Sequence, residues 1–219
     1  MQALVRGLIV LLAFVVAGTA ARSEIKERYG FKQARIVVEK KTKNASVELT
    51  AIDTVYIDDW GWVEVRYSHV VQDVRMIKQK TESWTVSIME REWLTTYDPV
   101  KKKGNKMKNP FYATIGNLSG EQQKGMAEGM AKAFEAKATA KGTEEIAGKM
   151  CDVTETRVAL QGMETVTTTW MWKGLVVKLV SNGMGTEITE LVTSINEGVG
   201  VRSDLKKIPD DVEIIGPAK

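Results

Sequence analysis

Apolar and polar side chains alternate along most of this chain, and the alternation is clearest in its last third. Four short runs between residues 149 and 195 repeat the pattern: KMCDVTETRV, ETVTTTWMWKG, LVVKLVSN and TEITELVTSI. A period of two is typical of β-strands that bury one face. These runs predict an antiparallel meander with one apolar face, which another element or a ligand must cover.

The first half of the chain follows the same pattern. Apolar positions alternate within residues 32–39, 47–57, 62–71, 74–80, 84–89 and 93–97, where β-branched and aromatic residues are frequent. The segment DDWG at residues 58–61 predicts a turn, because Asp and Gly accept turn geometry. Residues 98–117 contain Pro99, Pro110 and a lysine cluster, and they predict a loop.

Residues 119–138 predict one main helix. The segment SGEQ at residues 119–122 fits a capping box, and Met126, Met130 and Phe134 recur every four residues as an apolar stripe. The predicted fold class is therefore α+β, with a large curved antiparallel sheet (an incomplete barrel) wrapped around one main helix.

Residues 1–21 predict a signal peptide. Arg6 precedes an apolar run at residues 8–16, and the small residues GTA at 18–20 suit cleavage near Ala20 or Ala21. The alternative is a retained membrane anchor, but the apolar run is shorter than the about 20 residues that span a bilayer. We expect residues 22–219 to form a single domain in the periplasm. No cysteine follows the cleavage site, so we expect no lipidation there.

Composition narrows the classes of partner. The formal net charge is +3, which does not favour nucleic acid in an exported protein. The chain has one cysteine, Cys151, so it has no internal disulfide. We interpret Cys151 as a buried small side chain and not as a reactive thiol.

The sequence shows no constellation that carries enzyme chemistry. His69 is the only histidine, no Gly-x-Ser-x-Gly elbow accompanies it, and one His and one Cys do not make a zinc site. We expect no catalytic residue, metal or cofactor. A hydrolase that uses His69 beside a nucleophile is kept as a less favoured hypothesis.

A basic loop contains Lys101, Lys102 and Lys103. It suits contact with an anionic membrane surface, where each positive charge contributes about 1 kcal/mol. It also suits a solvated hairpin tip that deters pairing between sheet edges.

Methionine and tryptophan are frequent, with 10 and 6 residues. Alternation places Trp170 and Trp172 on one face of their strand. With the stripe of Met126, Met130 and Phe134 they could line a cavity between sheet and helix that accepts an acyl chain. The alternative is plain core packing of the same side chains.

Several segments together carry a family resemblance: the signal peptide, YIDDWG at 56–61, EIAGKMC at 145–151, WMWKGL at 170–175 and IP at 208–209. This order resembles the superfamily of periplasmic lipoprotein carriers (the LolA/LolB-like fold), and in particular its DUF4412-type members. The resemblance implies an incomplete antiparallel barrel around helices, with a hydrophobic cavity for acyl chains and a role in sorting outer membrane lipoproteins. The buried arginine of the true carriers has no match here.

These observations predict an exported, non-enzymatic binder or carrier of lipid or lipoprotein acyl chains. The ligand would lie in a hydrophobic cavity between sheet and helix. The alternative is a structural or interaction module of the cell envelope with a filled core.

Overall fold

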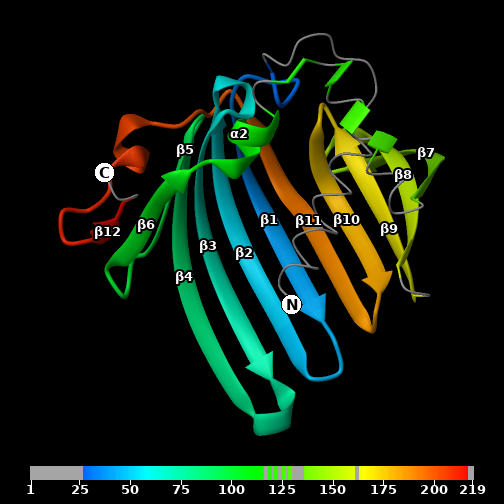
Figure 1. Ribbon diagram of the computed structural model, residues 1–219, viewed down its shortest axis with the longest axis horizontal. Coiled ribbons are helices and arrows are strands. Elements are labelled where there is room, and N and C mark those ends of the chain that lie inside the picture. The colour runs from blue at the N-terminus through cyan, green and yellow to red at the C-terminus, as the bar shows by residue number, and fades with distance from the viewer. Residues whose placement is uncertain are drawn as a thin grey trace.

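The computed structural model describes residues 27–115, 118–119, 121–122, 125–126, 128–129, 136–160 and 163–216. These residues form one open 12-stranded sheet (Figure 1), in the order β12-β6-β5-β4-β3-β2-β1-β11-β10-β9-β8-β7. Neighbouring strands are antiparallel except for β12, which runs parallel to β6. The chain therefore builds two meanders, β1 to β6 and β7 to β11, that join where β1 pairs with β11.

The strands have the following bounds: β1 Ala34–Lys43, β2 Val47–Asp58, β3 Val63–Val74, β4 Gln79–Glu90, β5 Trp93–Asp98, β6 Lys103–Lys108, β7 Lys137–Ile146, β8 Lys149–Leu160, β9 Met163–Trp172, β10 Leu175–Gly183, β11 Thr186–Glu197 and β12 Glu213–Ile215. The helical elements are shorter: α2 Pro110–Ile115 and the 3-10 turns η1 Asp59–Gly61, η2 Arg75–Ile77 and η3 Ser203–Lys206. No helix within these described ranges is long and apolar enough to cross a membrane.

The predicted α+β fold with one main helix is wrong. In the described part of the chain the architecture is one open sheet, and its single bounded α-helix, α2, has 6 residues. Within the predicted helix 119–138, residues 121–122, 125–126 and 128–129 have helical backbone, but residues 137 and 138 already belong to β7. Pairing of β7 with β8 along its whole length outweighs the helix propensity of its alanines and lysines.

Most predicted strands are confirmed, and the predicted loop is wrong. The four runs of the last third become β8 to β11, and five of the six runs before residue 98 become β1 to β5. The run predicted at 74–80 is wrong, because it contains the turn η2 between the ends of β3 and β4. Residues 98–117 contain β6 and α2 instead of a continuous loop. Pro110 opens α2, a position where proline's fixed φ and missing N–H are tolerated. The predicted signal peptide lies outside the described residues.

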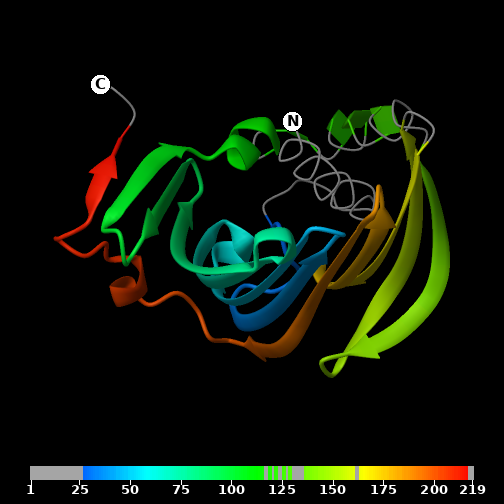
Figure 2. The same cartoon turned by 90° about the horizontal axis from the view of Figure 1, so that it is seen from below.

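The sheet curves into a trough with two different faces (Figure 2). The C-terminal segment with η3 packs on the outside of the trough, where it covers an apolar cluster of Val65, Val86, Ile88, Tyr97 and Val212. A second cluster includes Ala34, Ile36, Val55 and Ile57, which alternate along β1 and β2 on the inner face. The two clusters divide the core between opposite faces of one sheet.

The predicted turn at residues 58–61 is confirmed as η1. Asp58 accepts a hydrogen bond from the backbone N–H of Asp59, and Trp60 and Gly61 have positive φ angles of 58° and 93°. A Cβ on Gly61 would lie 2.5 Å from Tyr29 Cδ2, so only glycine fits. The N–H groups of Arg28 and Tyr29 both donate to Trp60 O, which ties the segment before β1 to this turn.

Candidate functional site

Charged side chains from four adjacent strands meet on the inner face of the trough. Asp53 on β2 is 2% exposed, and its Oδ2 lies 2.7 Å from Arg66 Nη1 on β3 and 3.0 Å from Lys40 Nζ on β1. Lys40 Nζ lies 3.9 Å from Oε2 of Glu190 on β11. The antiparallel registers explain the grouping, because Lys40 pairs with Glu190 and its neighbour Val38 pairs with Asp53. Lys40, Asp53, Arg66 and Glu190 are called the inner-face charge cluster below.

The cluster shifts the pKa of two of its members, Asp53 and Arg66. Burial raises the pKa of Asp53, but Lys40, a hydrogen bond from Ser68 and Arg66 together outweigh burial and hold that pKa below its usual value. Burial lowers the pKa of Arg66, and the carboxylates of Glu64 and Asp53 outweigh this effect. Asp53 Oδ1 is buried without a hydrogen-bond partner in the described part of the chain.

Glu64 extends the cluster toward the segment before β1. It is 8% exposed and accepts hydrogen bonds from Arg28 Nη1 at 2.7 Å and from Tyr29 Oη at 3.2 Å. Its other oxygen lies 4.0 Å from Arg66 Nη2. Burial raises the pKa of Tyr29, so the phenol stays a neutral donor. These contacts fix the entry of the chain into the sheet and complete a charged strip across its floor.

Hydroxyl groups line the inner face on β9 and β10, which lie beyond β11 in the sheet. Thr165, Thr167 and Thr169 alternate along β9 and are buried. Their registers connect them through β10 to β11 and β1, because Thr167 pairs with Ser181 and Ser181 pairs with Ile188. The hydroxyl oxygens of Thr167 and Ser181 lie 2.8 Å apart. A buried face that is polar and internally hydrogen-bonded replaces the aliphatic lining that a simple acyl-chain cavity requires.

Aliphatic side chains lie beside the charge cluster, toward the hairpin tips. Leu49 and Ile188 both pair with Thr42, and Val70 pairs with Ala51. Leu49, Val70 and Ile188 are half-buried, so they keep surface for contact. A molecule on this face would meet aliphatic carbon and charged groups within a few strands.

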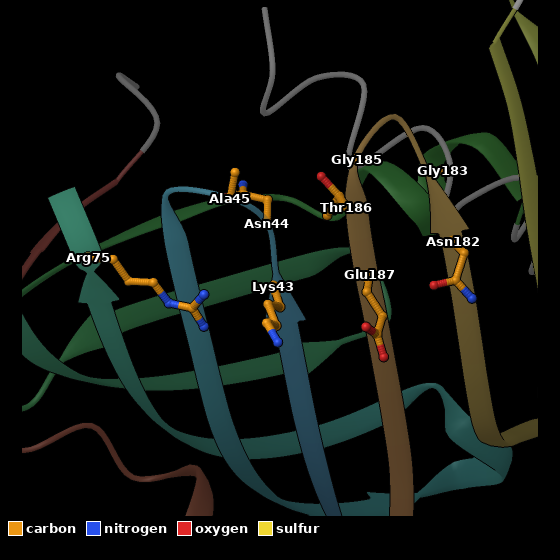
Figure 3. A pocket seen from close by; sticks show the side chains of 9 residues that line it. All are labelled: Lys43, Asn44, Ala45, Arg75, Asn182, Gly183, Gly185, Thr186 and Glu187. Atoms are coloured by element: carbon orange, nitrogen blue, oxygen red, sulfur yellow. The ribbon is translucent and has the colours of Figure 1, made fainter.

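An open groove of about 410 Å³ lies at the tips of the hairpins (Figure 3). It is lined by Lys43, Asn44, Ala45, Arg75, Asn182, Gly183, Gly185, Thr186 and Glu187. Some of its polar groups are already used: Arg75 pairs with Glu48, and Asn44 Oδ1 accepts from the N–H groups of Ser46 and Val47. Most of the side chains that line the groove are polar or charged, and none of the residues predicted to bind an acyl chain is among them.

The structure places the predicted ligand-binding residues in different surroundings. Met126 is half-buried, while Met130 and Phe134 lie outside the described residues. Trp170 is 8% exposed, and its Nε1 donates to Glu144 Oε2 at 2.5 Å while Lys178 Nζ lies 4.1 Å from its ring centre. Trp170 is thus held by side chains of β7 and β10.

Trp172 lies at the opposite end of the sheet from the groove. It stacks on Phe31 with ring centres 5.3 Å apart. Lys149 and Lys173 each place Nζ 4.7 Å from its ring centre, and both pair with Glu197. The part of Trp170 and Trp172 in ligand binding stays a prediction.

The lysine loop is the turn between β5 and β6. Lys101 pairs with Asp98 at 3.2 Å and Lys102 with Asp211 at 3.1 Å, while Lys103 opens β6. Two of the three charges are thus partly neutralised by the chain itself, and nothing in the fold supports the predicted membrane contact.

The remaining candidate residues are found in ordinary surroundings. His69 on β3 stacks on Trp84 with ring centres 3.9 Å apart, and its Nε2 lies 3.3 Å from Glu82 Oε2. Cys151 is buried, as predicted, and burial raises the pKa of its thiol. Within the described ranges, no group of three or more His, Cys, Asp or Glu residues is placed to hold a metal ion.

Sequence reasoning missed the charge cluster, although a signal was present. Lys40 continues the buried alternation of Ala34, Ile36 and Val38, and Asp53 stands between the buried Ala51 and Val55. A charged residue at a position where the alternation calls for an apolar one will face the buried side of the sheet. Such a residue indicates that an oppositely charged partner lies on the same face.

Comparisons with known proteins yield distant structural neighbours. No family model matches the chain, and no curated protein sequence matches it. An uncharacterized conserved protein from Thermus thermophilus has 9% identity and a TM-score of 0.49, over 95% of this chain and 99% of the other. LprF from Mycobacterium bovis has 14% identity and a TM-score of 0.39, over 92% and 95% of the two chains.

A putative outer membrane lipoprotein-sorting protein domain from Vibrio parahaemolyticus has 9% identity and a TM-score of 0.32, over 80% of this chain and 89% of the other. A lipoprotein-sorting domain is thus among the structural neighbours, as the sequence resemblance implied. These likenesses are too distant to carry a function from one protein to another, and the DUF4412-type assignment stays a prediction.

Proposed function

We propose that this protein is an exported, non-enzymatic binder of an amphipathic lipid, either free or as the acyl part of a lipoprotein, on the inner face of its curved sheet. The observation that carries the proposal is the composition of that face. The inner-face charge cluster lies next to half-buried aliphatic side chains, so one surface offers both kinds of contact that a lipid needs.

The aliphatic part of the face suits the hydrocarbon part of the ligand. Leu49, Val70 and Ile188 lie on adjacent or nearby strands and share the inner face. Each buried methylene of a ligand contributes about 0.8 kcal/mol. The predicted part of Met126, Met130, Phe134 and Trp172 in ligand binding belongs to the same proposal. Trp170 pairs with Lys178 and so lies on the face opposite that of Thr169 and the charge cluster.

The charged part suits a polar head group. Lys40 and Arg66 are partly exposed, with 27% and 35% of their side-chain surface accessible, so they can donate to a ligand while holding Asp53. Because the cluster contains two cations and two carboxylates, it favours a head group that both donates and accepts hydrogen bonds over a simple anion.

The proposed location is the periplasm, with the signal peptide removed near Ala20 or Ala21. A lipid carrier between two membranes needs this compartment, and the sequence pattern of residues 1–21 supports it.

The test is lipid binding by the mature chain and by two variants of neighbouring residues. Val70 faces inward and pairs with Ala51, whereas Val71 faces outward and pairs with Thr50, and both are half-buried. We expect Val70→Glu to weaken binding of palmitate and of a diacylated lipopeptide by about tenfold, because it places a carboxylate among aliphatic groups. Val71→Glu is the matched control and should bind as wild type does.

Native mass spectrometry of detergent-free protein and titration with both probes give the answer. Equal loss in both variants would move the binding surface away from the inner face. No copurified lipid and no uptake of either probe would favour the alternative, a structural or interaction module with a filled interior. The internal pairing of the charge cluster and of Thr167 with Ser181 is the observation that favours this alternative.

A further inference from the structure

The hairpin turns at one end of the sheet carry exposed apolar side chains. The turns β1–β2, β3–β4 and β10–β11 lie side by side there (Figure 1), because β2 pairs with both β1 and β3, and β1 pairs with β11, up to this end. The backbone N–H of Arg75 donates to Ser46 O at 3.0 Å and joins two of the turns. Met76 and Ile77 are 80% and 64% exposed, and Met184 is 38% exposed. Residues 44–46, 75–78 and 184–185 of these turns are called the tip rim below.

These apolar side chains contribute little to the fold. Within the described residues, Met76, Ile77 and Met184 belong to neither apolar cluster of the core. Turns at hairpin tips favour Gly, Asn, Asp and Ser, yet the sequence RMIK occupies the β3–β4 turn. Two adjacent large apolar side chains that project into water at a hairpin tip indicate a contact surface.

The charges of the tip rim are complementary to an anionic surface. The turn residues themselves include the cations Arg75 and Lys78 and no carboxylate. Lys43 and Lys80 stand at the adjoining ends of β1 and β4. Lys43, Lys78 and Lys80 are exposed, and none of them makes an ion pair with a described residue. Arg75 is shared, because it pairs with Glu48.

Three carboxylates lie near this end of the sheet and do not reverse its charge. Glu48, Asp73 and Glu187 stand inside their strands and not in the turns. Glu48 is already paired with Lys41 and Arg75. Each unpaired lysine near an anionic bilayer strengthens binding about fivefold. The tip rim therefore gains from an anionic surface in spite of these carboxylates.

The spacing of the apolar tips favours a bilayer over a protein partner. The β3–β4 and β10–β11 turns are separated by four strand spacings, or about 20 Å. Both turns are free hairpin ends, and the groove between them is lined mostly by polar side chains. A bilayer interface accepts separate apolar side chains, whereas a protein partner needs a matched pocket for each of them.

We propose that the tip rim docks on an anionic lipid bilayer. Met76, Ile77 and Met184 enter the boundary between head groups and acyl chains, and the lysines contact lipid phosphates. This docking turns the end of the trough nearest Leu49 and Ile188 toward the membrane. The inference goes beyond the proposed function, because it uses none of the inner-face residues and holds whether or not the trough binds a lipid.

Cosedimentation of the mature chain with lipid vesicles tests the docking. We expect wild type to bind vesicles of equal parts phosphatidylglycerol and phosphatidylcholine, and to bind pure phosphatidylcholine vesicles about tenfold more weakly. Met76→Asp should weaken binding to the anionic vesicles by about tenfold, because it removes an apolar side chain that the interface buries and adds a negative charge. Met184→Asp tests the second tip and should weaken binding by about fivefold, since Met184 projects less. Met76→Leu keeps an apolar side chain and should bind as wild type does.

Met150→Asp is the matched control. Met150 is 61% exposed and lies beside the β7–β8 turn, at the opposite end of the sheet, so its loss should leave vesicle binding unchanged. Circular dichroism shows whether each variant keeps its fold. Palmitate titration separates the two proposals: Met76→Asp should take up palmitate as wild type does, and Val70→Glu should still bind vesicles.

Three outcomes would overturn the inference. The first is a wild-type chain that does not bind the anionic vesicles, or binds both kinds of vesicle equally. The second is an equal loss of vesicle binding in Met76→Asp and Met150→Asp. The third is unchanged vesicle binding in both Met76→Asp and Met184→Asp.

Discussion

The two faces of strand β3 bury their side chains in opposite ways. Val65 points outward into an apolar cluster that the C-terminal segment covers. Its neighbours Glu64 and Arg66 point inward and join Asp53 in a network of charges. The outer face gains stability from burial of apolar surface, which is favourable in any relative orientation of the side chains. The inner face carries a desolvation cost that its ion pairs must offset.

The largest expected effect is on the outer face. Val65 is fully buried, and Val65→Asp would place an unpaired carboxylate among Val86, Ile88 and Tyr97. We expect a loss of about 4 kcal/mol in the free energy of unfolding. Urea unfolding followed by circular dichroism measures it. Ile52→Asp is the control on the same face: Ile52 is 55% exposed, and the change should stay below about 0.5 kcal/mol. Similar losses in both variants would mean that the outer cluster is not a core.

A smaller effect is expected on the inner face. Asp53→Asn removes the charge that Lys40 and Arg66 share, and leaves two cations near each other. Breaking a fully buried pair costs about 3 to 5 kcal/mol, but these cations are partly exposed to water, so we expect about 2 kcal/mol. Asp73→Asn on the same sheet, at an exposed outward position, is the control. An unchanged or raised stability of Asp53→Asn would show that the cluster does not hold the floor of the trough.

The strands of this fold could be predicted from the sequence because each buries one face. Alternation along residues 149–195 located β8 to β11 with errors of a few residues. The strand β7 could not be predicted this way, because nearly all of its side chains are exposed and its apolar and polar residues do not alternate. Its strand conformation comes from pairing with β8, which is a tertiary contact.

The site was harder to predict than the fold. Lys40 and Asp53 lie 13 residues apart in sequence, and the registers of β1–β2, β1–β11 and β2–β3 bring them together with Glu190 and Arg66. Local patterns favoured the methionines and tryptophans, because large apolar side chains suit a ligand cavity as well as a core and a local pattern does not distinguish the two. A more informative signal was that Lys40 and Asp53 occupy positions where the alternation calls for apolar residues. This signal does not identify their partners or a ligand.

The smallest expected effect is the pH dependence of the inner face. The pKa of Asp53 lies below its usual value in the folded protein, because Lys40, a hydrogen bond from Ser68 and Arg66 together outweigh burial. Its contribution to stability is therefore fully present above the unfolded pKa of about 3.9 and is lost as the pH falls through the lower folded value. We expect the difference in unfolding free energy between wild type and Asp53→Asn to be constant from pH 7 to about pH 5 and to shrink below about pH 4. Exposed carboxylates with lowered pKa values, such as Asp98 and Glu155, titrate in both proteins and cancel in this difference. A difference that stays constant down to pH 2 would mean that Asp53 acts through packing and hydrogen bonds, and the contrast between the two faces of β3 would then not rest on charge.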